Sequence, residues 1–145
     1  RQLLRQLRPP ALDELSFKEA LHHLLNEFAF AERGIRCRFD YRLIATPESE
    51  TVRFTLYRLL QELLNNVCKH ADASEVAIAL YQQGTLLRLE VKDNGIGISP
   101  DKMAGFGIQG MRERVSALGG ELTLESQRGT RVIVNLPTNL QQTAG

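Results

Sequence analysis

The sequence has no tryptophan, only two cysteines and no apolar run near the ~18 residues needed to span a membrane. Cys37 and Cys68 form neither a CxxC pair nor a metal-ligand spacing, so we expect two small hydrophobic side chains in a reducing compartment. A net charge of +1 argues against a protein that binds nucleic acid by neutralising its phosphates, although a local basic cleft for one nucleotide fits the same balance.

What remains is the composition of an ordinary globular domain. The 145 residues, 43% of them hydrophobic, suit one domain with its own core. The chain starts at Arg1 rather than at a methionine, in a segment that reads as a helix up to Leu7 and is stopped by Pro9 and Pro10. We therefore expect a piece of a longer protein.

Helical and alternating patterns follow one another without an internal repeat. The helical pattern predicts helices at residues 16–33, 46–71 and 107–118. Ser16 and Glu19 form a capping box for the first, and Pro47 suits the first position of the second. Alternation predicts strands at residues 35–43, 74–81, 86–91, 121–126 and 130–136. This order predicts the α+β class: a two-layer α/β sandwich with three helices on one face of a mixed, mostly antiparallel sheet of about five strands.

Polar residues gather on one edge of the second predicted helix, beside its apolar face. They are Glu62, Asn66, Lys69 and His70. One interpretation is a solvated face with an i,i+4 network. The other is a metal site, because asparagine is a poor helix former and its amide oxygen is a hard ligand that suits Mg²⁺.

A glycine-rich segment, Asp93-Asn94-Gly95-Ile96-Gly97, follows the third predicted strand. Asn-Gly is a strong hairpin signal, which is one interpretation. No strand pattern follows, however. The second interpretation is therefore a loop whose glycines let the backbone approach a ligand while Asp93 accepts hydrogen bonds from it.

Two more glycine segments follow later in the chain, at residues 105–110 and 129–130. Residues 105–110 read GFGIQG and match the dinucleotide fingerprint GxGxxG, but no strand precedes them as that motif requires. This leaves either a flexible loop or a hinge before a helix N-terminus that attracts phosphate. Gly129-Thr130 alone is a turn signal between the last two strands.

Taken in this order, the segments resemble the ATP-binding domain of sensor histidine kinases. That domain has the Bergerat-type fold shared with DNA gyrase and the mismatch-repair ATPases. The similar segments are residues 61–71 (the N box) and residues 93–97, 105–114 and 129–130 (three glycine boxes). Met111-Arg112-Glu113-Arg114 and Lys69-His70-Ala71 are similar to the branch that senses nitrate and hexose phosphates. Residues 7–15 resemble that branch's junction between dimerisation and catalytic domains.

The resemblance implies roles at the phosphate end of a nucleotide site. Asn66 would bind the Mg²⁺ that bridges the ATP phosphates. Glu62 would hold a metal-bound water or assist proton removal from the attacking group. Lys69 and His70 would face the phosphates. Positioning and charge neutralisation of this kind are what phosphoryl transfer mainly requires.

The resemblance also implies an adenine end. Asp93 would accept the adenine amino group, and Thr130 would support the base through water. The glycines that the resemblance assigns are Gly95 and Gly97, which would shape the adenine pocket, and Gly105 and Gly107, which would hinge a lid over the phosphates.

For the whole protein, the resemblance implies that the ATP γ-phosphate passes to a histidine on a separate dimerisation domain and then to a response regulator. His22, His23 and His70 do not lie in the acidic dimer helix expected for that acceptor, so we expect it to precede Arg1 and this chain not to phosphorylate itself. We expect residues 1–15 to end the dimerisation helix, residues 16–137 to form the catalytic domain and residues 138–145 to form a tail. The parent would be a homodimer anchored in the bacterial inner membrane, with this domain in the cytoplasm.

Two alternatives stay open. A gyrase-type or repair-type ATPase fragment would carry a longer lid and a second domain. A catalytically silent interaction module would keep the fold without turnover, although intact Glu62, Asn66, Asp93 and Gly107 argue against it.

Overall fold

The computed structural model describes residues 16–138. The expected end of a dimerisation helix (residues 1–15) lies outside this range, as does the expected tail beyond residue 138. The helices are α3 (Phe17–Phe28), α4 (Glu50–Asn66) and α5 (Ile108–Ala117), with the short turns η1 (Phe30–Arg33), η2 (Val67–Ala71) and η3 (Pro100–Phe106). The strands are β1 (Arg36–Tyr41), β2 (Glu75–Gln83), β3 (Leu86–Asp93), β4 (Glu121–Gln127) and β5 (Gly129–Pro137).

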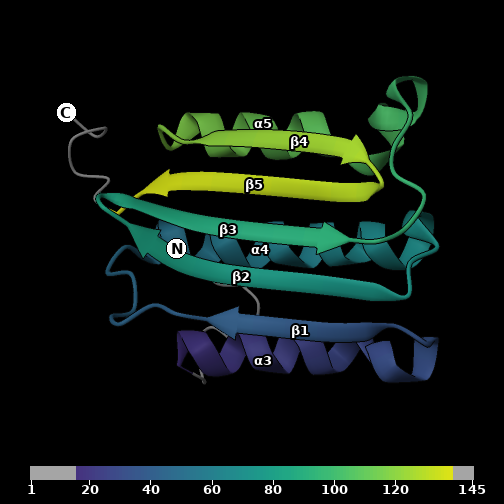
Figure 1. Cartoon of the computed structure of the whole chain (residues 1–145). Coiled ribbons are helices and arrows are strands. Elements are labelled where there is room, and N and C mark those ends of the chain that lie inside the picture. Colours follow the sequence, from purple (N-terminus) through teal and green to yellow (C-terminus); the bar gives the residue numbers. More distant parts are fainter. Residues whose placement is uncertain (1–15, 139–145) are drawn as a thin grey trace, which may run out of the picture.

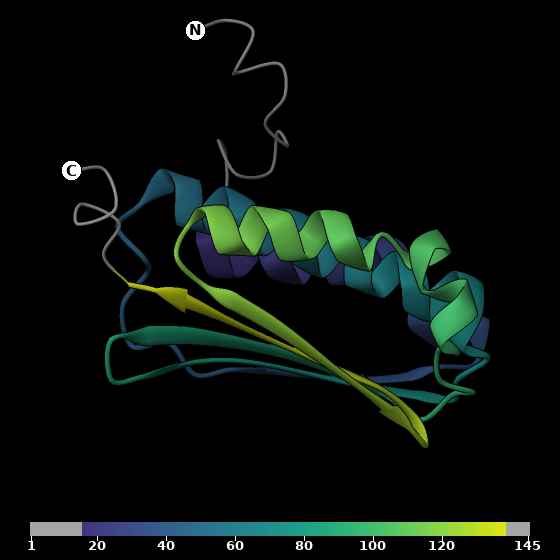
Figure 2. The same cartoon turned by 90° about the horizontal axis from the view of Figure 1, so that it is seen from above.

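The strands form one sheet in the order β1-β2-β3-β5-β4. β1 and β2 are parallel, and the other three pairs are antiparallel. The three helices lie side by side on one face of the sheet, and the other face is open (Figures 1 and 2). The predicted two-layer α+β sandwich with a mostly antiparallel sheet is therefore confirmed.

The core lies between the helix layer and the sheet, and α4 runs along its centre. The predicted apolar face of this helix is buried throughout: Val52, Leu56, Leu59, Leu60, Leu63, Leu64 and the following Val67 are all at most 3% exposed. Strands β2 and β3 alternate buried and partly exposed positions, so one face of each packs against α4. Burial of one continuous apolar face thus fixes the position of the polar edge of α4.

Two of the predicted helices have the wrong limits. The first ends at Phe28 rather than Gly34, because Ala29 adopts a left-handed conformation (φ 49°) and η1 follows. The second begins at Glu50, so Pro47 is not its first residue. Ser49 caps it, with the side-chain oxygen accepting a hydrogen bond from the Val52 amide at 3.2 Å. A serine cap satisfies a free amide of the first turn, which Pro47, two residues before Ser49, does not do.

The ends of two other elements also differ from the prediction. The last turn of the long predicted helix, η2, is a widened π turn that ends where Asp72 becomes left-handed (φ 50°). β3 extends through Asp93, so this residue belongs to a strand rather than to a loop. After the loop that follows β3, where the sequence shows no strand pattern, the chain forms η3, which has 3₁₀ geometry.

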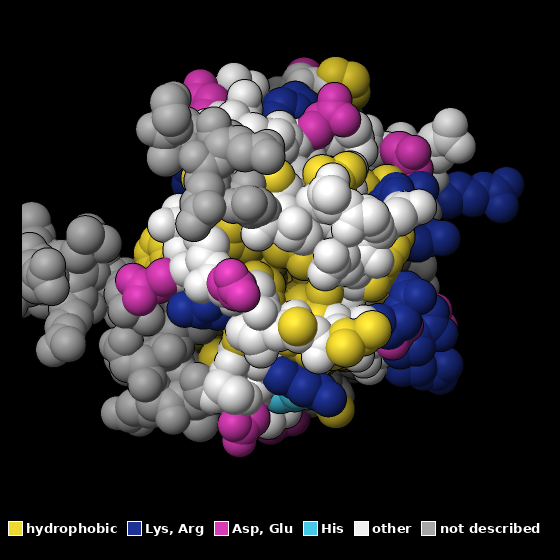
Figure 3. Space-filling model, turned by 90° about the vertical axis from the view of Figure 1, so that its left-hand side faces the viewer, with side chains coloured by type: hydrophobic (Ala, Val, Ile, Leu, Met, Phe, Trp, Pro, Cys, Tyr) yellow, Lys and Arg dark blue, Asp and Glu magenta, His cyan; other side chains and the backbone are white. Residues whose placement is uncertain are grey.

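The open face of the sheet carries a charged network that links four strands. Glu90 on β3 accepts hydrogen bonds from Tyr81 on β2 (2.7 Å) and from Arg131 on β5 (2.9 Å), and Arg131 also binds Glu125 on β4 (3.1 Å). Burial would raise the pKa of Glu90, but these hydrogen bonds and the nearby arginine charges hold it below its ordinary value. Seen from the end of the molecule, Lys and Arg side chains gather along this face, at the right of Figure 3.

Within residues 16–138, no helix is both long enough and apolar enough to cross a bilayer.

The central position of α4 predicts a large cost for truncating its buried leucines. Leu60 is 1% exposed, so we expect Leu60→Ala to lower the free energy of unfolding by about 2–5 kcal/mol. Leu86→Ala is the control, because Leu86 is 40% exposed, and we expect a change below about 1 kcal/mol. Urea denaturation of both variants checks this, and equal losses would contradict the assignment of the core.

Candidate functional site

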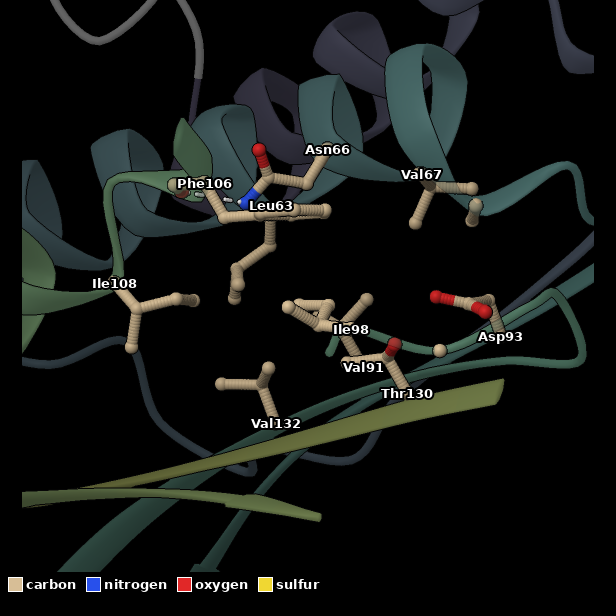
Figure 4. Close-up of a pocket in the computed structure, with 12 residues that line it drawn as sticks. Leu63, Asn66, Val67, Val91, Asp93, Ile98, Phe106, Ile108, Thr130 and Val132 are labelled. Atoms are coloured by element: carbon tan, nitrogen blue, oxygen red, sulfur yellow. Dashed lines mark hydrogen bonds between the residues drawn. The ribbon is translucent and has the colours of Figure 1, made fainter. Parts of the chain in front are cut away.

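A small pocket lies between α4, the ends of β3 and β5, and the segment that leads into α5 (Figure 4). Its apolar lining consists of Leu63, Val67, Ala71, Val91, Ile98, Phe106, Ile108 and Val132. The remaining lining residues are Asn66, Asp93, Gly97 and Thr130. The enclosed space is about 20 Å³, which holds about one water molecule. A flat organic ligand would therefore enter only after neighbouring side chains move aside.

Asp93 is the polar centre of this pocket. It is 6% exposed, and among residues 16–138 it is the one charged residue that is buried. Its carboxylate points into the pocket (Figure 4), and Oδ1 accepts a hydrogen bond from the Gly95 amide at 2.8 Å. Burial raises the pKa of Asp93, and hydrogen bonds from the backbone of Gly95 and Thr130 offset part of that rise. A carboxylate beside apolar walls is suited to accept a hydrogen bond from an amino group on a flat ligand.

The raised pKa of Asp93 means that ionisation of this carboxyl lowers the stability of the folded protein. The folded protein holds the Asp93 proton more tightly than the unfolded chain does, so ionisation of this carboxyl costs stability. The cost is absent below the ordinary pKa of aspartate and fully present above the raised pKa. A buried carboxylate whose ionisation lowers the stability of the fold is typical of a functional site.

Close backbone contacts hold Asp93 in place from both sides. A Cβ on Gly95 would lie 1.9 Å from the carbonyl oxygen of Ala71, and a Cβ on Gly129 would lie 2.1 Å from that of Asp93. The Ile96 amide also donates to the Ala71 carbonyl at 2.7 Å. The loop after β3 is therefore pressed against the end of η2, and only glycine fits these two positions.

Asn66 forms the opposite side of the pocket and is tied to the segment before α5. Its amide nitrogen donates to the Phe106 carbonyl at 2.9 Å, while the amide oxygen points away from the apolar lining (Figure 4). The His70 ring packs against the Phe106 ring with centroids 4.2 Å apart. Two residues of the polar edge thus hold Phe106 over the pocket.

Glu62 lies one turn before Asn66 on the same helix. Its Oε1 accepts a hydrogen bond from Arg114 on α5 at 2.6 Å. Its Oε2 lies 3.7 Å from where a Cβ on Gly107 would be, at the start of α5. Glu62 therefore borders the junction between η3 and α5 rather than the apolar pocket.

The structure brings together most of the residues that the sequence singled out. Asn66, Asp93, Gly97 and Thr130 line one pocket, and Gly95 holds its loop in place. His70 packs on Phe106 at its border, and Glu62 and Gly107 lie together at the junction between η3 and α5. Lys69 and Gly105 are exposed and do not line the pocket.

Three residues that contribute to this geometry were absent from the sequence-based site. Phe106 covers the pocket, Ser126 accepts a hydrogen bond from the Ile98 amide at 2.6 Å, and Arg114 binds Glu62. Phe106 stands between two glycines, which was a signal for a special role. Arg114 was noted as part of the stretch Met111-Arg112-Glu113-Arg114 but given no role, and Ser126 looked like an ordinary surface residue of a strand. The partners of both residues are far away in the sequence.

Comparison with known proteins gives one consistent result. Residues 51–140 match the family described as histidine kinase-, DNA gyrase B-, and HSP90-like ATPase. Over 138 residues the chain is 49% identical to the signal transduction histidine-protein kinase/phosphatase UhpB of Salmonella typhimurium, covering 94% of this chain and 28% of that protein. Over 141 residues it is 38% identical to the sensor histidine kinase LiaS of Bacillus subtilis, covering 94% of this chain and 38% of that protein.

Solved structures agree at the level of the fold. The histidine kinase domain of a blue-light activated kinase from Erythrobacter litoralis EL346 matches with a TM-score of 0.66 and 22% identity, over 88% of this chain and 61% of that chain. The Acinetobacter baumannii histidine kinase AdeS matches with a TM-score of 0.67 and 19% identity, over 85% of this chain and 65% of that chain. The chain spans only about a third of the length of its curated relatives, at 28% and 38%.

The two glycines with opposite surroundings predict opposite results on substitution. Gly95→Ala would force a Cβ into the Ala71 backbone, whereas a Cβ on Gly105 meets nothing within 4 Å. We expect Gly95→Ala to lower the free energy of unfolding by about 1–3 kcal/mol and Gly105→Ala to change it by less than about 1 kcal/mol. Chemical denaturation checks both, and a fully stable Gly95→Ala variant would refute the close packing of this loop.

Proposed function

Because the chain belongs to the family of histidine kinase-, DNA gyrase B- and HSP90-like ATPases, and is the ATP-binding domain of a sensor histidine kinase within it, we propose that it transfers the ATP γ-phosphate to a histidine on a separate dimerisation domain, for relay to a response regulator. The observation that carries the proposal is one pocket with the Asp93 carboxylate on one side and the Asn66 amide on the other. The first suits the base of the nucleotide, and the second suits its phosphates.

At the adenine end, Asp93 accepts a hydrogen bond from the exocyclic amino group of the base. Val91, Val132 and Ile98 supply apolar surface for the ring faces, and Thr130 supports the base through water. Guanine presents a carbonyl where adenine has its amino group, and this carbonyl would face the buried carboxylate without a shared proton. The site therefore selects adenine over guanine, with Gly95 shaping the loop around it.

At the phosphate end, Asn66 supplies an amide oxygen to Mg²⁺. The oxygen suits this role because the amide nitrogen already donates to Phe106 while the oxygen points away from the apolar lining. Within residues 16–138, no group of three or more His, Cys, Asp or Glu side chains could hold a metal ion. An ion at Asn66 would take its other ligands from phosphate oxygens and water. Lys69 and His70 face the same phosphates and add positive charge or hydrogen-bond donors.

The lid is the segment from Gly105 to Gly107, with η3 before it. Phe106 covers the pocket, with its carbonyl bound by Asn66 and its ring packed against His70, and it moves aside when nucleotide enters. Gly107, which has a left-handed φ of 70°, absorbs the backbone change at the start of α5. The N-terminus of α5 then points its free amide groups at the phosphates.

In the transfer step, a ring nitrogen of the acceptor histidine attacks the γ-phosphorus and forms the nitrogen–phosphorus bond. The bond between this phosphorus and the bridging oxygen breaks, and ADP leaves with the electron pair. Glu62 either takes the proton released from the imidazole or orients a water at the phosphates. The acceptor precedes Arg1 in the parent protein, so this chain alone binds ATP without phosphorylating itself.

The remaining proposals concern the whole protein. Residues 16–137 form the catalytic domain, and the parent is a homodimer anchored in the bacterial inner membrane. The domain described by the structure then works in the cytoplasm, where ATP and the response regulator are available.

Substitution of Asn66 tests the phosphate end. Asn66→Asp replaces an amide donor by a carboxylate, which repels both the Phe106 carbonyl and the phosphates, and we expect ATP to bind at least about tenfold more weakly with Mg²⁺ present. Asn65→Asp makes the same charge change next to it on α4, outside the pocket lining, and should stay within about threefold. Titration calorimetry measures both, and equal affinities for the two variants would remove Asn66 from the site.

The buried carboxylate predicts a pH dependence of ATP binding. Protonation removes the acceptor that Asp93 offers to adenine, and its pKa lies above the ordinary value of about 3.9 for an aspartate. ATP affinity should therefore fall as the pH drops through the raised pKa of Asp93. At that pH an exposed aspartate would still be ionised. The same titration on Asp93→Asn, which we expect to bind ATP about tenfold more weakly, reports the protonation of all groups other than Asp93, on the nucleotide and on the protein. Equal pH slopes for the two proteins would exclude Asp93 as the adenine acceptor.

A further inference from the structure

Arg114 joins α5 to the polar edge of α4 through one short contact. Its Nη2 donates to Glu62 Oε1 at 2.6 Å, across 52 positions of sequence. The two side chains are 44% and 28% exposed. Ion pairs with this much exposure stabilise a fold only slightly, so the main physical effect of the contact is on the orientation of the carboxylate.

The contact engages only one oxygen of Glu62. Oε1 is held by Arg114, whereas Oε2 accepts no hydrogen bond from the described residues and lies beside Gly107 at the end of the lid. A free glutamate side chain samples many rotamers, and a planar guanidinium restricts it to few. The pair therefore presents Oε2 at the junction of the lid with α5.

Arg114 is itself held in position for this contact. Its Nε lies 3.4 Å from the carbonyl oxygen of Gly110, one turn earlier on α5. Arg112 points elsewhere, since its Nε lies 3.4 Å from the Leu122 carbonyl. Arg58 shares a groove of about 260 Å³ with Arg114 but donates to Gln61 rather than to Glu62. Among these three arginines, only Arg114 orients the carboxylate.

We propose that Arg114 is a positioning residue for phosphoryl transfer, which acts by orienting the Glu62 carboxylate toward the lid and the reacting group. The proposal rests on the proposed role of Glu62. Arg114 itself does not contact the nucleotide, so its loss slows the chemical step and leaves ATP binding nearly unchanged. Its lysine variant keeps the charge but loses the planar fork, and restores only part of the rate.

The test uses a chimera in which this chain replaces the matching region of the Salmonella typhimurium kinase, with label from γ-labelled ATP as the readout. We expect Arg114→Ala to lower kcat by about tenfold or more, with KM for ATP within about threefold. Arg58→Ala, which removes the same kind of side chain from the same groove, should stay within about twofold of the unsubstituted chimera. Thermal melting of each variant shows whether it is folded.

A double-mutant cycle separates positioning from other roles. If Arg114 acts through Glu62, then Glu62→Gln with Arg114→Ala is no slower than Glu62→Gln alone. Independent, multiplying losses would overturn the proposal, as would an Arg114→Ala variant as active as Arg58→Ala or one that raises KM while kcat stays intact. An unsubstituted chimera that takes up no label would instead contradict the proposed function.

Discussion

Close backbone packing around Asp93 is the constraint on which the rest of the site depends. The strand end that carries this carboxylate lies between η2 and the start of β5, and glycine is required where each neighbour approaches it, at Gly95 and Gly129. The carboxylate at this strand end lies in an apolar pocket, and its burial raises its pKa. A carboxylate buried in this way suits the role proposed for it, which is to accept a hydrogen bond from the adenine amino group.

The proposed phosphate end is held by partly exposed side-chain contacts rather than by close backbone packing. Three of the four residues on the polar edge of α4 have a partner from the lid or from α5: Asn66 binds the Phe106 carbonyl, His70 packs on the Phe106 ring, and Glu62 binds Arg114. These contacts are exposed or partly exposed, so each is weak. In the proposed function they exchange for contacts with nucleotide, whereas the close backbone packing beside Asp93 is kept. One rigid end and one adaptable end suit a site that recognises a base and then closes over phosphates.

Sequence patterns predicted the parts of this arrangement that depend on local periodicity. The apolar face of α4 placed Asn66 and Glu62 on one edge of the helix, and alternation located all five strands. The limits of α4 were missed because a serine cap at Ser49 competed with a proline signal at Pro47. Arg114, Phe106 and Ser126 were missed because their contacts join residues 28 to 52 positions apart or depend on the fold of the lid. Contacts of this range leave no trace in a helical or alternating pattern.

The central claim is that one pocket holds adenine at Asp93 and a phosphate-bound magnesium ion at Asn66. A crystal structure of this chain with Mg²⁺ and a non-hydrolysable ATP analogue tests it most directly. We expect the exocyclic amino group of the base within hydrogen-bond distance of the Asp93 carboxylate, the metal bound by the Asn66 amide oxygen, and Phe106 displaced from the pocket. A base seated away from Asp93, or a metal bound without Asn66, would contradict it.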